Sequence, residues 1–199
     1  MPVVTAKLAA AHIAPPPAPP KPSHPQLPPT SAAPQPPPAL PPSKKYHIFL
    51  GHNWGAPPAY ANHHHVMALA SALQRLGLIV WIDGERLSGK ILAQITSGVE
   101  DSVVFVACVT PTYLEKIKAA SRDGADNDWC EQEFSYAHDV LGVSHMIATV
   151  TDPAALNPKQ WVGPVRFVLG GALFVDASGA DKVQTAAVEI AARIAKLLA

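Results

Sequence analysis

Beyond residue 44, apolar residues follow two patterns that alternate along the chain. Short runs rich in β-branched residues predict buried strands, and an apolar residue every three or four positions predicts amphipathic helices. The predicted strands are 46–51, 78–82, 103–110, 145–150 and 171–177. The predicted helices are 62–77, 91–102, 112–120, 128–142 and 181–198. Alternation through short connections predicts an α/β fold with a central parallel five-stranded sheet and helices on both faces.

Two of the predicted helices carry a distinct apolar side. Asn62 is placed to cap the first helix and Gly77 to end it. The apolar face of this helix consists of Val66, Leu69, Leu73 and Leu76. The apolar side of the helix over 128–142 consists of Trp129, Cys130, Phe134 and Ala137. We therefore expect Trp129 to pack in the core. The stretch 151–170 is interpreted as a loop.

Residues 1–43 differ in composition from the rest of the chain. Most of the 22 prolines lie here, and no acidic residue occurs before Asp83. Proline fixes φ and removes the backbone N–H, so a disordered or polyproline II tail is expected. Its P-x-x-P spacing makes the tail a candidate ligand for SH3 or WW domains, and the alternative is a spacer. The folded domain is expected to span residues 44–199.

The charge and the cysteines narrow the class of protein. Lys+Arg and Asp+Glu number 15 each, so the net charge gives no reason to expect a nucleic-acid partner. No run approaches the roughly 20 apolar residues that a membrane span requires. The cysteines, Cys108 and Cys130, form no disulfide framework, which favours a reducing, cytoplasmic location. For Cys130, core packing is favoured over a redox role.

Two local motifs suggest chemistry that the surrounding residues disfavour. Gly84-x-x-x-x-Gly89-Lys90 resembles a P-loop, but Ile91 stands where a hydroxyl should hold magnesium. Asp83 and Glu85 would also repel a phosphate there. The histidines at 63–65 point about 100° apart on a helix, so they cannot share one metal ion well. We therefore expect neither a P-loop nor a metal site.

Five segments in order resemble a Toll/interleukin-1 receptor (TIR) domain over residues 45 to about 178. They are KYHIFLGHNWG, VMALASALQRLGLIVWID, ERLSGK, ITSGVEDSVVFVACVTPTYL and DWCEQEFSYA. The resemblance implies a flavodoxin-like three-layer TIR fold. It also implies that Asp83 begins a long loop, with Leu87-Ser88-Gly89, that gates a nucleotide pocket and mediates assembly.

The resemblance leaves two functional classes open. Some TIR domains are non-enzymatic adaptors that recruit other TIR domains in signal transduction and innate immunity. Others are NAD+ nucleosidases that cleave the nicotinamide–ribose bond, releasing nicotinamide with ADP-ribose or a cyclic isomer.

The second class carries a glutamate four residues after an aromatic position, and Glu133 after Trp129 matches this pattern. The enzyme is the favoured reading, with NAD+ as substrate, no separate cofactor and activation through homo-oligomers. A nucleotide-processing enzyme of related topology is a weaker alternative.

The chemistry of this cleavage suits one carboxylate. Loss of nicotinamide leaves an oxocarbenium-like ribose, whose positive charge a nearby Glu133 would stabilise. Glu133 lies one helical turn after Trp129 and shares its side, whereas Glu131 is about 200° away and should face solvent.

The resemblance places further NAD+ contacts after the first strand, but NAD-cleaving animal enzymes of the family tend to carry arginine at the position of Asn53 or Trp54. Arg86 or Lys90 of the long loop is expected to substitute for that arginine. The candidates for NAD+ contacts are Gly51, His52, Asn53, Trp54, Asp83, Arg86 and Lys90.

Overall fold

The computed structural model describes residues 37–82, 91–123 and 128–199. The strands are β1 (Tyr46–His52), β2 (Val80–Ile82), β3 (Ser102–Val109), β4 (Met146–Val150) and β5 (Val175–Asp176). The α-helices are α1 (Ala61–Arg75), α2 (Ile91–Glu100), α3 (Pro111–Asp123), α4 (Trp129–Leu141), α5 (Gly163–Leu169) and α6 (Val183–Leu198). Three short 3-10 helices, η1 (Val143–His145), η2 (Pro153–Ala155) and η3 (Pro158–Gln160), complete the described elements. Within these ranges, no helix is long and apolar enough to cross a membrane.

The strands form one parallel sheet with the order β2-β1-β3-β4-β5. β1 and β3 pair over most of their length, from Tyr46 with Ser102 to His52 with Cys108. Every residue of β3 is buried, as expected for a central strand with helices on both faces. This arrangement confirms the predicted α/β fold and its five parallel strands.

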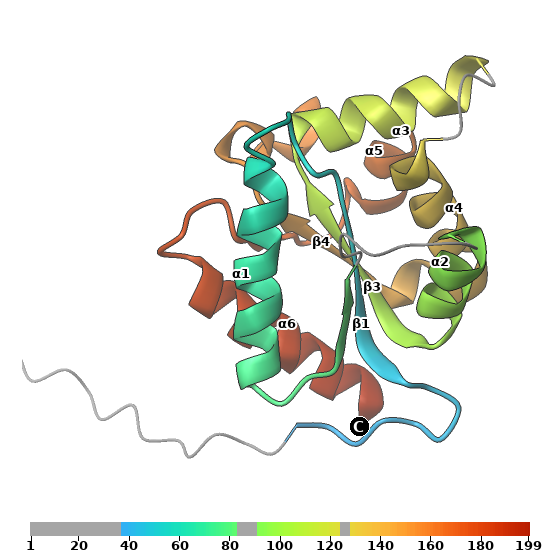
Figure 1. Cartoon of the computed structure of the whole chain (residues 1–199), viewed down its shortest axis with the longest axis vertical. Helices are drawn as coiled ribbons and strands as arrows, with labels where there is room; N and C mark the ends of the chain where they lie inside the picture. The colour runs from blue at the N-terminus through green and yellow to red at the C-terminus, as the bar shows by residue number, and fades with distance from the viewer. Residues whose placement is uncertain (1–36, 83–90, 124–127) are drawn as a thin grey trace, which may run out of the picture. The chain divides into compact units, whose positions relative to one another are not determined.

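Helices cover both faces of the sheet and give the fold its three layers (Figure 1). α1 and α6 pack together on one face, over alternate residues of the central strands such as Ile48, Leu50 and Val106. α2, α3, α4 and α5 cover the other face, over Phe49, Phe105 and their neighbours. The alternation of side chains along each strand therefore divides the core into two clusters.

β2 departs from the prediction that it is buried on both faces. It forms the edge of the sheet, and all three of its residues are half-buried. Trp81 stacks on Phe49 with ring centroids 4.1 Å apart and 12° between the planes. Gly98 of α2 faces the same ring, and an added Cβ there would lie 2.7 Å from Trp81 Cε2. An apolar run thus marks a strand but does not distinguish a central strand from an edge strand.

The stretch 151–170 holds η2, η3 and α5, where the sequence suggested a loop. α5 is short and begins with Gly163 and a proline, which are usual signals of a loop. Trp161 precedes it and is buried, with its Nε1–H donating to Ala155 O at 2.7 Å. The final strand is also shorter than predicted, because only Val175 and Asp176 pair with β4.

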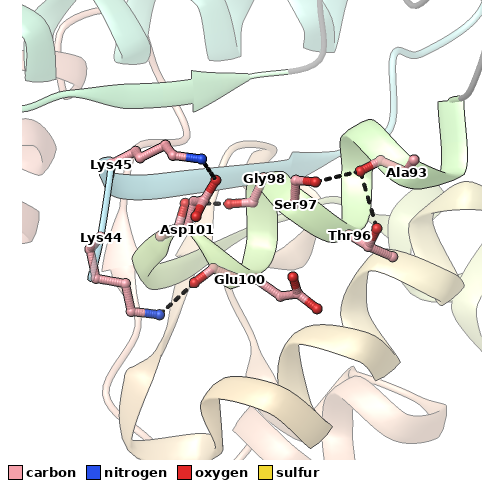
Figure 2. A network of polar contacts seen from close by, with 9 residues as sticks. Lys44, Lys45, Ala93, Thr96, Ser97, Gly98, Glu100 and Asp101 are labelled. Atoms are coloured by element: carbon pink, nitrogen blue, oxygen red, sulfur yellow. Dashed lines mark hydrogen bonds and ion pairs between the residues drawn. The ribbon is translucent and has the colours of Figure 1, made fainter.

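The packed part of the chain begins before the predicted boundary between residues 43 and 44. Leu40 packs against the core cluster under α1 and α6, and the His47 Nε2 atom lies 2.8 Å from Pro38 O. At the start of β1, Lys45 Nζ pairs with Asp101 Oδ2 at 2.7 Å, and Lys44 Nζ donates to Glu100 O at 2.6 Å (Figure 2). The predicted disorder of residues 1–36 lies outside the described residues.

Candidate functional site

A cleft of about 460 Å³ opens at the carboxyl ends of β1 and β3. The strand order reverses here, because β2 lies on one side of β1 and β3 lies on the other. In open parallel sheets, such a reversal is where ligands bind. The lining residues are His52, Asn53, Trp54, Gly55, Thr112, Lys116, Asp128, Trp129, Cys130 and Glu133.

Glu133 lies in the first half of α4 and is 5% exposed. It belongs to the lining of the cleft together with Trp129, one turn earlier, as the helical spacing predicts. Glu131 lies away from the cleft lining and is half-buried, where it accepts a hydrogen bond from Ser135 Oγ at 2.7 Å. The two acids of the same helix therefore occupy different environments.

The start of α4 is fixed by Asp128. Its side chain caps the helix by accepting a hydrogen bond from Cys130 N at 2.9 Å, and Lys116 Nζ lies 2.5 Å from its other oxygen. Burial favours the neutral acid, but the hydrogen bonds from Lys116 and Cys130 outweigh it and lower the pKa of Asp128. The cap therefore stays ionised and holds the first turn of α4 against the cleft.

Cys130 packs in the core, as predicted. It is 6% exposed, and its Sγ donates toward His52 O at 3.7 Å. Burial, and then the nearby carboxylate of Glu133, raise the pKa of the Cys130 thiol far above its usual range. A protonated, buried thiol is a poor nucleophile, so this environment does not support a redox role for Cys130.

Trp129 does not pack in the core, and this expectation was wrong. Its side chain is 42% exposed and forms part of the cleft wall. The buried side of α4 consists of Cys130, Glu133, Phe134 and Ala137, so Trp129 lies one position away from it. The error arose because an aromatic residue beside an apolar stripe was counted as part of it.

Gly51 lies within β1 and does not line the cleft. An added Cβ would stand 2.2 Å from Cζ of Phe105, a residue of the neighbouring strand β3. The glycine is therefore required by the ring of Phe105. This glycine has a packing role, and its predicted contact with NAD+ stays a prediction.

His52 and Trp54 both line the cleft and are linked through His63 of α1. His52 Nε2 lies 2.8 Å from His63 Nδ1, and both rings are buried. Trp54 stacks on His63 with centroids 4.4 Å apart and 25° between the planes. Burial lowers the pKa of His52 to about 4. The three successive histidines separate: His64 is exposed, and His65 Nε2 lies 2.6 Å from Ala177 O.

Asn53 is 3% exposed and is held by residues that the sequence did not single out for this role. Thr110 Oγ1 donates to its Oδ1 at 2.6 Å, and Asn62 Nδ2 donates to its backbone oxygen at 2.6 Å. Asn62 is thus not the cap of α1, which begins one residue earlier after Tyr60, a residue in the left-handed conformation (φ 42°). Its amide bridges α1 to β1 instead.

The site residues predicted from the sequence also omit Gly55, Thr112, Lys116 and Asp128, which line the cleft. Thr112 and Lys116 lie one turn apart on α3, and Asp128 immediately precedes α4. The spacing of Thr112 and Lys116 on the helix after β3 was a signal that could have found them. Asp83, Arg86 and Lys90 lie outside the described residues, and their predicted contacts with NAD+ stay predictions.

The fold and the position of the cleft define a doubly wound α/β domain with a cleft at its topological switch point. More specifically, the chain belongs to the TIR domain family, whose family model matches residues 48–189. None of the curated proteins matches the sequence.

Among solved structures, the chain is similar to one titled as a metazoan TIR-STING receptor from C. gigas. The two share 13% sequence identity with a TM-score of 0.50. The similarity covers 75% of this chain and 42% of the receptor chain, so this protein spans less than half of that relative. At this identity the comparison shows a shared fold.

Proposed function

We propose that this protein is an NAD+ glycohydrolase that uses Glu133 as its catalytic carboxylate. The observation that supports the proposal is a buried carboxylate in the lining of the switch-point cleft, with the tryptophans Trp54 and Trp129 in the same lining. The resemblance of Trp129-Cys130-Glu131-Gln132-Glu133 to NAD-cleaving TIR domains supports the same substrate.

The proposed reaction breaks the bond between the nicotinamide nitrogen and C1 of the ribose. Nicotinamide is positively charged while attached and leaves as a neutral base with the bonding electrons, so no general acid is required. The positive charge moves to the ribose, where the Glu133 carboxylate stabilises it and can orient an attacking water. Attack by water gives ADP-ribose and one proton, whereas attack by a ring nitrogen of the adenine gives a cyclic isomer.

The charges of the cleft suit the nicotinamide half of the substrate. Glu133 and Asp128 are acids, and Lys116 is a cation held by Asp128 at 2.5 Å. Two carboxylates and one ammonium group give the cleft a net negative charge. This charge favours the cationic nicotinamide ring and the cationic ribose that remains after cleavage. Contacts with the pyrophosphate are assigned to Lys116 and to Arg86 and Lys90, which would substitute for the arginine that NAD-cleaving relatives tend to carry after the first strand.

Self-association is part of the proposal, because the resemblance implies that a second TIR domain completes the pocket through the loop after β2. The proposed output is a signal in defence, carried by the loss of NAD+ or by its products. The proline-rich tail would then serve as a spacer or as a site for an SH3- or WW-type partner.

The test measures nicotinamide released from NAD+ by the purified full-length protein, at several protein concentrations. Glu133→Gln keeps the size of the side chain and removes its charge, and we expect the rate to fall by on the order of 100-fold or more. Glu131→Gln is the matched control on the same helix and should retain the rate of the parent. If self-association completes the pocket, the rate per molecule should rise with concentration.

Two outcomes would contradict the proposal. A Glu133→Gln protein as active as the parent would show that another group carries the chemistry. The absence of nicotinamide release at every concentration would favour the non-enzymatic adaptor.

A further inference from the structure

The amide of Asn53 stands at the junction of a polar network that joins the ends of three strands. Asn53 follows β1, Thr110 follows β3, and Thr151 follows β4, while Asn62 reaches them from α1. Asn62 Nδ2 donates to Asn53 O at 2.6 Å, and Asn62 Oδ1 accepts from Thr151 Oγ1 at 2.9 Å. The network lies directly beside the cleft, because Asn53 is one of its lining residues.

The direction of each hydrogen bond determines which way the Asn53 amide points. Thr110 Oγ1 accepts a hydrogen bond from Tyr113 N at 3.0 Å, and its own O–H donates to Asn53 at 2.6 Å. A hydroxyl that donates requires an acceptor, so the Asn53 atom facing Thr110 is the oxygen. Asn62 Nδ2, a donor at 3.3 Å from the same atom, requires an oxygen there as well.

The side-chain oxygen of Asn53 therefore accepts two hydrogen bonds, one from Thr110 and one from Asn62. The amide nitrogen of Asn53 points away from both donors. Within residues 37–82, 91–123 and 128–199, this nitrogen makes no hydrogen bond, and Asn53 lines the cleft. A donor that lines a cleft and has no protein partner is available to an acceptor atom of a ligand.

We infer that the Asn53 Nδ2 group is a hydrogen-bond donor for an oxygen of bound NAD+, and that Thr110 and Asn62 are positioning residues that hold it toward the cleft. This inference rests on the proposed function for the identity of the ligand. The inference gives the Asn53 side chain the role of a donor and not of an acceptor. The cleft should therefore prefer ligands that place an oxygen beside Asn53 Nδ2.

Steady-state kinetics with the full-length protein test the positioning role. Thr110→Val keeps the shape of the side chain and removes the hydroxyl, which leaves the Asn53 amide able to turn. We expect KM for NAD+ to rise about fivefold with kcat nearly unchanged, because one neutral hydrogen bond contributes on that scale. Thr110→Ser restores the hydroxyl and should restore KM. Asn53→Asp keeps the accepting oxygen, removes the donor and should raise KM at least as much.

A second measurement follows the Asn53 side-chain NH2 resonances by NMR while NAD+ is added. Glu133→Gln is the background, so that the substrate is not consumed. We expect these resonances to shift on binding, and to do so less in the Thr110→Val background. Nicotinamide alone and ADP-ribose alone, titrated separately, show which half of NAD+ carries the acceptor.

The outcomes separate this inference from the proposed function. If NAD+ is cleaved but KM is unchanged in both Thr110→Val and Asn53→Asp, the role of Asn53 is wrong and the enzyme stands. If NAD+ shifts the Asn53 resonances but is never cleaved, the donor stands and the glycohydrolase proposal fails. If NAD+ shifts no resonance of the cleft and is not cleaved, both are overturned.

Discussion

At the scale of single residues, His52 shows how burial changes the chemistry of a side chain beside the cleft. Leu50 O, 3.3 Å from His52 Nδ1, can only accept, so Nδ1 carries the proton of the neutral ring. His52 Nε2 is then an acceptor, and His63 Nδ1–H donates to it across 2.8 Å. A proton added to His52 Nε2 would place two donors face to face and break this bond.

The hydrogen-bonded pair of His52 and His63 predicts that the stability of the fold depends on pH. Burial is the main reason that the pKa of His52 is lowered to about 4 in the folded protein, from 6.5 in the unfolded chain. As the pH falls below 6.5, the unfolded state takes up a proton that the folded state does not, so stability decreases. The decrease continues to about pH 4 and is on the order of 3 kcal/mol in total. Urea unfolding at pH 7.5, 5.5 and 4.5 measures it.

His52→Gln is the control for this pH dependence, since glutamine does not titrate. Acids elsewhere in the chain contribute to both proteins, so the informative quantity is the difference between the two slopes. The parent should lose more stability than the variant between pH 6.5 and 4. Equal slopes would show that His52 is protonated as easily in the folded protein as in the unfolded chain.

At the scale of elements, β1 depends on a residue without a side chain. Gly51→Ala would bring a Cβ to 2.2 Å from the ring of Phe105, which is fully buried and stacks on Phe49. We expect a loss of about 1–3 kcal/mol in the free energy of unfolding, measured by urea denaturation. Gly171→Ala is the matched control, because nothing lies within 4 Å of an added Cβ there. A neutral Gly51→Ala would mean that the ring moves at little cost.

The sequence predicted the long elements well because their apolar periods are set by burial. α1, α4 and α6 agree with the expected helices to within about two residues at their ends. α5 was missed, since its few residues cannot display a period and it begins with Gly163 and a proline. The edge position of β2 was also missed, because the order of strands depends on contacts between segments distant in the sequence.

The candidate site was predictable where one helix or one loop carries it. Trp54 and Glu133 follow from local spacing and from resemblance, and both line the cleft. Thr110 and Asn62 were not identified, because their role depends on the close approach of three strand ends. The exposure of Trp129 depends on where α4 sits against the sheet, which its own sequence does not determine.

At the scale of the whole molecule, the boundary of the folded unit can be tested by truncation. A protein that begins at Lys44 lacks the packing of Leu40 and the contact between Pro38 O and His47 Nε2. We expect it to be about 1–3 kcal/mol less stable than the full-length chain by urea unfolding. A protein that begins at Pro34 keeps Pro38 and Leu40 and should match the full-length chain.

One outcome of the truncation experiment would contradict this prediction. If the proteins that begin at residues 34 and 44 unfold at the same urea concentration, residues 37–43 add nothing to stability. The boundary predicted from composition would then be the better one.

The stacking of Trp81 has a consequence for how the length of this chain can change. Trp81 lies just before the segment 83–90, and Gly98, which faces the same ring, lies in the helix that follows it. The strand before the segment and the helix after it therefore pack together at this ring. For inserted residues without structure of their own, doubling the length between two fixed ends costs only about 0.6 kcal/mol. Insertions and deletions at this point are therefore a route by which a TIR domain can acquire a new loop while its sheet stays intact.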